Sequence, residues 1–245
     1  MAPTCLARML DACQRGPLVI AWHDYLFEPD VDEATRRLYE NPVSLEARLP
    51  TTYAGVDEFC DAVLDDWGLN FIGPTSSSLI HRDCVSRYGE FRGDIRTFPD
   101  YEYWLRVASN EGLAIVPERL ITFRVHNTSI SAGIREEFRR KTTLTLEPLL
   151  LMLQFARAPD YDNLRRRALA RRPPIDPERA LRDGAFDARW LAGELRYRRR
   201  DDAPLRQWNA FCESHPEMAD VLRDVDANMT RWGRFKQFVK GKFYR

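Results

Sequence analysis

The spacing of apolar residues predicts a helix followed by β-structure in the centre of the chain. From Asp100 onward, apolar side chains recur three or four residues apart, as on a helix with one buried face, and Gly112 follows where glycine commonly ends a helix. Asp100 stands at the start of this helix as its expected cap. After Gly112 the period changes to two, which predicts a strand over 113–116, ended by Pro117, and a second strand over 120–126.

The preceding residues predict further alternation of helix and strand. Residues 4–15 have helical spacing at four positions: Leu6, Met9, Leu10 and Cys13. The continuous apolar run 18–22 is typical of a buried strand, so a helix and a strand together form half of an α/β unit. Residues 30–56 are polar and predict a surface connection, which leads to a helix that ends at Gly68.

The last part of the chain predicts helices only. Residues 135–158 form one helical pattern whose second half is apolar around most of its circumference, as in a buried core helix. The Pro-rich segment 173–177 marks a boundary, and its Asp176 caps the next helix. Residues 214–217 read as a capping box that opens a helix over 218–228.

Composition indicates a globular protein without a global charge. Hydrophobic residues make up 44% and charged residues 30% of the chain, and 37 Lys and Arg balance 37 Asp and Glu, so nothing draws nucleic acid to the whole molecule. Five cysteines without paired spacing favour free thiols in a reducing compartment. The chain shows no leader-like N-terminus and no apolar run of membrane-spanning length, and we therefore expect a cytoplasmic protein.

The C-terminal stretch 231–245 differs from the rest. It holds six basic residues and no acid, and its aromatic residues keep to one side of a helical pattern. This composition suits an anionic membrane surface, which would make the protein peripheral at the inner face of the membrane. The alternative is a helix docked on its own domain with a basic edge in solvent.

Five short motifs occur in a characteristic order. They are Asn70 with the hydroxyl run Thr75–Ser78, then Arg82, then Gly89-x-Phe91, then Asp100-Tyr-Glu-Tyr-Trp-Leu-Arg106, then Pro117-Glu-x-Leu120 with Arg124-x-His126-x-x-Ser129-x-Ser131. This order resembles the acceptor-binding half of GT-A-type family 2 glycosyltransferases, over residues 6–133. The resemblance implies an α/β fold: a partial GT-A-like domain over 1–134, followed by an α-helical C-terminal region over 135–245.

The resemblance also implies a reaction, the inverting transfer of a sugar from a nucleotide-sugar donor to a saccharide or surface-glycan acceptor. Asp100 matches the family's catalytic acid, and a carboxylate is the group needed to take the proton from an attacking hydroxyl. Pro99 precedes it where the family often has a second acid. Tyr101 and Trp104 would stack on a sugar face. The remaining expected donor and acceptor contacts are Arg106, Arg124, Thr75 and Ser76.

The expected cofactor is a divalent metal, Mn²⁺ or Mg²⁺. His126 shares a strand face with Arg124 and is the expected ligand, with a hydrogen-bonded structural histidine as the alternative. In the family an upstream half supplies the nucleotide-binding loop and an Asp-x-Asp metal motif. Here the string Asp30-Val31-Asp32 reads instead as a solvated loop. A second function class therefore stays open: a non-catalytic, partner-dependent saccharide-binding or interaction module derived from such a domain.

Overall fold

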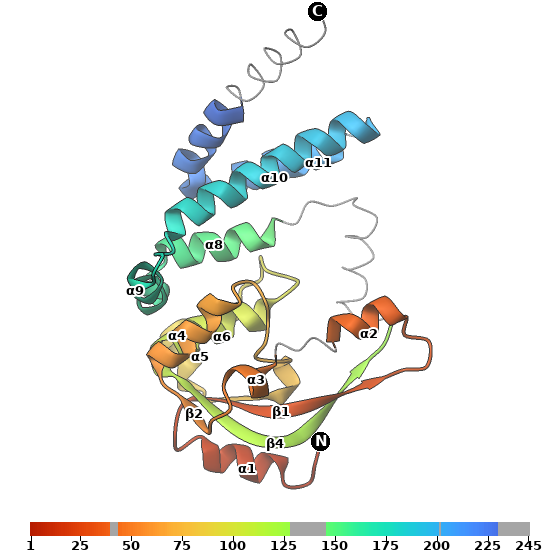
Figure 1. Ribbon diagram of the computed structural model, residues 1–245, viewed down its shortest axis with the longest axis vertical. Coiled ribbons are helices and arrows are strands. Elements are labelled where there is room, and N and C mark those ends of the chain that lie inside the picture. The colour runs from red at the N-terminus through yellow and green to blue at the C-terminus, as the bar shows by residue number, and fades with distance from the viewer. Residues whose placement is uncertain (40–43, 128–145, 201, 230–245) are drawn as a thin grey trace, which may run out of the picture. The chain divides into compact units, whose positions relative to one another are not determined.

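The computed structural model describes residues 1–39, 44–127, 146–200 and 202–229 (Figure 1). The stretch 231–245, for which we expect membrane binding, lies outside these residues. The chain forms two compact units, Met1–Ile134 with Arg157–Ile175 and Arg135–Ala156 with Asp176–Arg245. The predicted helical region thus contributes Arg157–Ile175 to the first unit.

The first unit is built on a four-stranded mixed sheet, which confirms the predicted α/β class. The strand order is β2-β4-β1-β3. The two central strands, β1 (Leu18–Phe27) and β4 (Leu113–Val125), run parallel, while β3 (Ser78–Ile80) pairs antiparallel with β1 and β2 (Tyr53–Ala54) pairs antiparallel with β4. Leu18 to Ala21 of β1 are fully buried because this strand is central and both of its faces are covered there, whereas Trp22 at the end of the apolar run is half-buried.

Helix α1 (Cys5–Ala12) covers one face of the sheet (Figure 1). Cys5, Met9 and Ala12 pack against the sheet, whereas Leu6 and Leu10 are more than half exposed. The helix was predicted correctly, but of its four predicted apolar positions only Met9 and Cys13 contact the core. Positions i, i+4 and i+7 share a face as well, and the small Cys5 and Ala12 let the helix approach the sheet closely.

The helices on the other face are α4 (Val56–Asp65), α5 (Asp83–Tyr88) and α6 (Pro99–Glu111) (Figure 1). Helix α9 (Asp162–Ala170) packs on α4, and η2 (Pro159–Tyr161) packs on α6. Ion pairs join α4 to the end of α9 and the residue after it, including Arg167 Nε to Asp61 Oδ1 at 3.1 Å and Arg171 Nη1 to Asp65 Oδ1 at 2.7 Å. The shorter elements of this unit are α2 (Glu33–Tyr39), α3 (Leu45–Arg48) and η1 (Thr75–Ser77).

The prediction of two strands separated at Pro117 is wrong, because β4 is one strand with a bulge. Ala21 of β1 pairs with Val116, and the next residue, Trp22, pairs with Arg119. The pairing therefore skips Pro117, which has no N–H to donate to a neighbouring strand, and Glu118. The bulge keeps β4 on the sheet and changes the register at Arg119.

Beyond the bulge, the predicted alternation is confirmed. Ile121 and Val125 are buried, while Thr122 and Arg124 are exposed. Gly112, which precedes the strand, has a φ of 76° as the C-cap of α6, in agreement with its predicted position at the helix end.

The second unit is helical in the part that the structure describes. Its elements are α8 (Glu147–Arg157), α10 (Pro177–Arg199), α11 (Ala203–Ser214), η3 (Pro216–Met218) and the helical residues 219–229. Asp176 caps α10 as predicted, accepting hydrogen bonds from Glu178 N and Arg179 N. The predicted capping box at 214–217 is wrong, since the Ser214 hydroxyl donates to the Phe211 carbonyl and a 3₁₀ turn intervenes.

Candidate functional site

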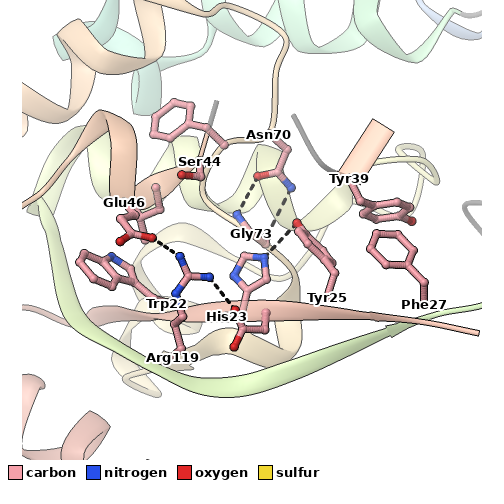
Figure 2. A pocket seen from close by; sticks show the side chains of 13 residues that line it. Trp22, His23, Tyr25, Phe27, Tyr39, Ser44, Glu46, Asn70, Gly73 and Arg119 are labelled. Atoms are coloured by element: carbon pink, nitrogen blue, oxygen red, sulfur yellow. Dashed lines mark hydrogen bonds and ion pairs between the residues drawn. The ribbon is translucent and has the colours of Figure 1, made fainter. Parts of the chain in front are cut away.

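The loop between α4 and β3 positions the first predicted site residues. Asn70 organises it: the side-chain oxygen accepts from Ile72 N and Gly73 N, each at 3.2 Å, and the amide donates to the Gly73 carbonyl at 3.4 Å (Figure 2). Gly73 has a φ of 120°, a conformation that favours glycine. The chain then turns through Pro74 into η1, which begins at Thr75.

Thr75 and Asp100 meet at the start of α6. The Thr75 hydroxyl donates to Asp100 Oδ2 at 3.0 Å, and Asp100 Oδ1 accepts from Tyr101 N at 2.8 Å. Asp100 is not the helix cap that we expected, because α6 begins at Pro99 and the cap position falls on Phe98. Proline is favoured at the first helical position, and Asp100 instead lies in the first turn, where a carboxylate interacts well with the helix dipole.

Two predicted sugar-stacking residues are closed to solvent. Tyr101 is 1% exposed and Trp104 is 0% exposed, so neither ring offers a face to a ligand in this structure. Their helical spacing predicted a buried face, and they lie on that inward face of α6. The stacking role expected for Tyr101 and Trp104 is therefore corrected to a role in the core.

Arg106 is also part of the core. Its Nε donates to Glu102 Oε1 at 3.1 Å and its Nη2 to Glu102 Oε2 at 2.9 Å, and the guanidinium further donates to the carbonyls of Tyr88 and Glu90. Four hydrogen bonds from the planar guanidinium thus fix the turn before α6 to the helix. This arrangement leaves Arg106 a structural role in place of the expected substrate contact.

The other predicted residues lie elsewhere on the first unit. Ser76 is exposed beside Thr75, whereas Arg124 lies near the far end of β4 and forms an ion pair with Glu28 at 3.5 Å. His126 follows β4 directly and is half-buried. The part of the chain that the structure describes contains no group of three His, Cys, Asp or Glu side chains placed to hold a metal ion, and the expected Mn²⁺ or Mg²⁺ stays a prediction.

The same loop that carries Thr75 helps to line a cavity of about 420 Å³. One wall is aromatic and comes from Tyr25 and Phe27 of β1 and Tyr39 at the end of α2 (Figure 2). The rings of Tyr25 and Tyr39 lie 5.1 Å apart between centroids, tilted by 59°, and those of Tyr25 and Phe27 lie 6.2 Å apart. Half-buried aromatic faces of this kind suit a flat, partly apolar ligand.

The opposite wall is polar and depends on the bulge in β4. Arg119 donates to Asp24 Oδ1 at 2.6 Å and also to Glu46, which lies on α3 (Figure 2). Ser44 starts α3 by accepting a hydrogen bond from Ala47 N at 3.2 Å, which places Glu46 over the sheet. Trp22 lines the cavity too, and its buried indole Nε1 has no hydrogen-bond partner.

His23 lies at the floor of the cavity, beneath the Asn70 loop. Its Nε2 and the Tyr25 hydroxyl are hydrogen-bonded at 2.9 Å. Burial, together with the charge of Arg119, lowers the pKa of His23, and the charge of Asp24 opposes this shift. The imidazole is therefore held in its neutral form near neutral pH. A Cβ at Gly73 would lie 2.7 Å from His23 Cε1, so the loop can approach this closely only with glycine.

These cavity residues were not among the predicted site residues. His23 has no sequence neighbour at a ligand or catalytic spacing, and Arg119 interacts with Asp24, 95 positions away. One local signal was present: aromatic rings at Tyr25 and Phe27 continue the predicted strand with a period of two. That pattern indicates a longer strand with one aromatic face.

Comparison of the chain with protein-family models, with curated proteins and with solved structures found no match. Within residues 1–39, 44–127, 146–200 and 202–229, no helix combines the length and the apolar content needed to cross a bilayer.

Proposed function

We propose that the chain carries the acceptor-side part of an inverting glycosyltransferase of GT-A type, with Asp100 as the general base. The observation that supports this most directly is the hydrogen bond from the Thr75 hydroxyl to Asp100 Oδ2. Two segments of the resembled motif pattern, 25 residues apart, meet there at one carboxylate. The loop that supplies Thr75 also lines the cavity through Asn70, Phe71 and Gly73.

In this proposal, Asp100 takes the proton from an acceptor hydroxyl as the oxygen attacks the anomeric carbon of the donor sugar. The new carbon–oxygen bond forms on the face opposite the bond to the departing nucleoside diphosphate, and the configuration inverts. Hydrogen bonds from Thr75 and Tyr101 N orient the carboxylate, which is the role of a preorganised base.

The test compares Asp100→Asn with Asp83→Asn. Both residues lie in the first turn of a helix, and Asp83 is exposed on α5. Release of nucleoside diphosphate is measured with a panel of nucleotide sugars and saccharide acceptors. Asp100→Asn should lower turnover by about 100-fold or more with little change in melting temperature, and Asp83→Asn should match the wild type. Equal turnover in the wild type and Asp100→Asn removes Asp100 from the reaction.

A non-catalytic saccharide-binding module is the second candidate. It is favoured by the structural roles of the string Asp30-Val31-Asp32: Asp32 accepts a hydrogen bond from Thr35 N at 2.7 Å at the start of α2, and Asp30 accepts one from Asn127 at 3.1 Å. Both carboxylates thus have structural partners. Saccharide binding by a wild-type chain that transfers no sugar from any donor would decide for this candidate.

A further inference from the structure

The charges around the cavity set what it can accept. Arg119 is the cation of the polar wall, and it is shared between the two carboxylates of Asp24 and Glu46. The described lining therefore has one more carboxylate than it has cations, and the neutral His23 adds no positive charge. The excess negative charge would repel a ligand with a phosphate, sulfate or carboxylate group. To pair with Arg119, such a ligand would have to displace one of its two carboxylates.

The uncharged groups of the cavity nevertheless offer hydrogen bonds. Ser44 adds a hydroxyl, and Glu46 and Asp24 have acceptor capacity beyond their bonds to Arg119. A ligand with several hydroxyl groups would satisfy this mixed set of donors and acceptors.

The aromatic wall and the volume of the cavity further restrict the ligand. Tyr25 and Phe27 present ring surface opposite the polar wall, so the ligand needs one apolar side and one hydroxylated side (Figure 2). The volume of about 420 Å³ falls in the lower part of the ~300–1,000 Å³ range of ligand pockets. A sugar ring has these properties, since C–H groups cover one of its faces and hydroxyls surround its edge.

We infer that this cavity binds an uncharged sugar unit and discriminates against acidic sugars through the Asp24–Arg119–Glu46 cluster. The inference rests on the proposed function in taking the acceptor to be a saccharide, and it adds that the bound unit is neutral. Tyr25 supplies the stacking face, Ser44 and the two carboxylates meet the sugar hydroxyls, and the excess carboxylate repels anions.

Binding is measured on the full chain by calorimetry and by saturation-transfer NMR, with methyl glucoside, methyl galactoside and methyl mannoside against methyl glucuronide. At least one neutral glycoside should bind, at least tenfold more tightly than the glucuronide. Tyr25→Leu should weaken that binding by about threefold to tenfold, the range for one aromatic stacking contact, while Tyr197→Leu at an exposed position of α10 should leave it unchanged. Tighter binding of the glucuronide, or no binding of any neutral glycoside, overturns the inference.

A charge reversal gives an independent readout. Replacing both partners, as Asp24→Asn with Glu46→Gln, leaves Arg119 without a carboxylate and should raise glucuronide affinity at least tenfold relative to the neutral glycoside. An unchanged preference in this double variant would show that the cluster does not set selectivity. Failure of the transfer assay with intact neutral-sugar binding would count against the proposed reaction only, and transfer without binding in the cavity would count against this inference only.

Discussion

Glu102 and Arg106 lie one helical turn apart in α6 and form an ion pair that is almost closed to solvent, with exposed side-chain fractions of 1% and 10%. The Tyr161 hydroxyl donates a third hydrogen bond, to Glu102 Oε1 at 3.0 Å, and ties η2 to the helix. The i, i+4 spacing of the two residues was evident in the sequence, but the burial of their side chains was not. The pair therefore joins α6, the turn before it and the segment after α8 into one structure.

Neutralising this carboxylate should strongly destabilise the first unit. Glu102→Gln leaves Arg106 buried beside an uncharged amide, which costs about 3–5 kcal/mol of unfolding free energy. The matched control is Glu33→Gln, in an exposed i, i+4 pair with Arg37, where a change within about 1 kcal/mol is expected. Urea denaturation followed by circular dichroism measures both, and similar midpoints for the two variants would contradict the structural role of the buried pair.

Gly73→Ala should disturb the roof of the cavity. The new Cβ would be strained at a φ of 120° and would lie 2.7 Å from His23 Cε1, so the loop or the imidazole must move. Gly93→Ala is the control, because a Cβ there meets nothing within 4 Å. We expect a loss of about 1–3 kcal/mol for Gly73→Ala and little change for Gly93→Ala in chemical denaturation. Equal stability of the two variants would show that the loop does not need glycine.

His23 should make stability depend on pH. Its pKa is lowered in the folded protein, so below about pH 6.5 the unfolded chain binds a proton that folded His23 does not. The unfolding free energy should therefore fall as the pH is lowered from about 6.5 toward the folded pKa, and no such loss should occur between about pH 7 and 8. Denaturation curves at each pH measure this, and His23→Gln should give a flatter dependence. An identical slope in that variant would assign the effect to other groups.

Cys60 should be inert toward thiol reagents. It is fully buried on α4, and burial, with the charges of Asp57 and Asp61, raises the pKa of its thiol to about 12. Treatment with iodoacetamide at pH 8 followed by peptide mass spectrometry should leave Cys60 unmodified in the native protein and modify it after denaturation. Rapid native labelling of Cys60 would mean that α4 opens readily.

The sequence alone determined the local structure of several elements. The period of two after Gly112 predicted the alternation of Ile121 and Val125 with polar residues, and Asp176 predicted the start of α10. These features depend on residues within a few positions of one another, where backbone sterics and caps act directly. The predicted strand end at Pro117 was wrong, because β4 continues to pair with β1 beyond this residue, although proline has no backbone N–H to donate.

Only the tertiary structure decided which residues surround an accessible space. Trp104 and Tyr101 have the composition of a sugar-stacking face, yet packing on both sides of α6 buried them. Arg119 and Asp24 are 95 residues apart and meet because β1 and β4 are parallel neighbours with a bulge between them. Contacts of this kind depend on how whole elements pack together. The spacing of residues within one segment does not reveal that packing.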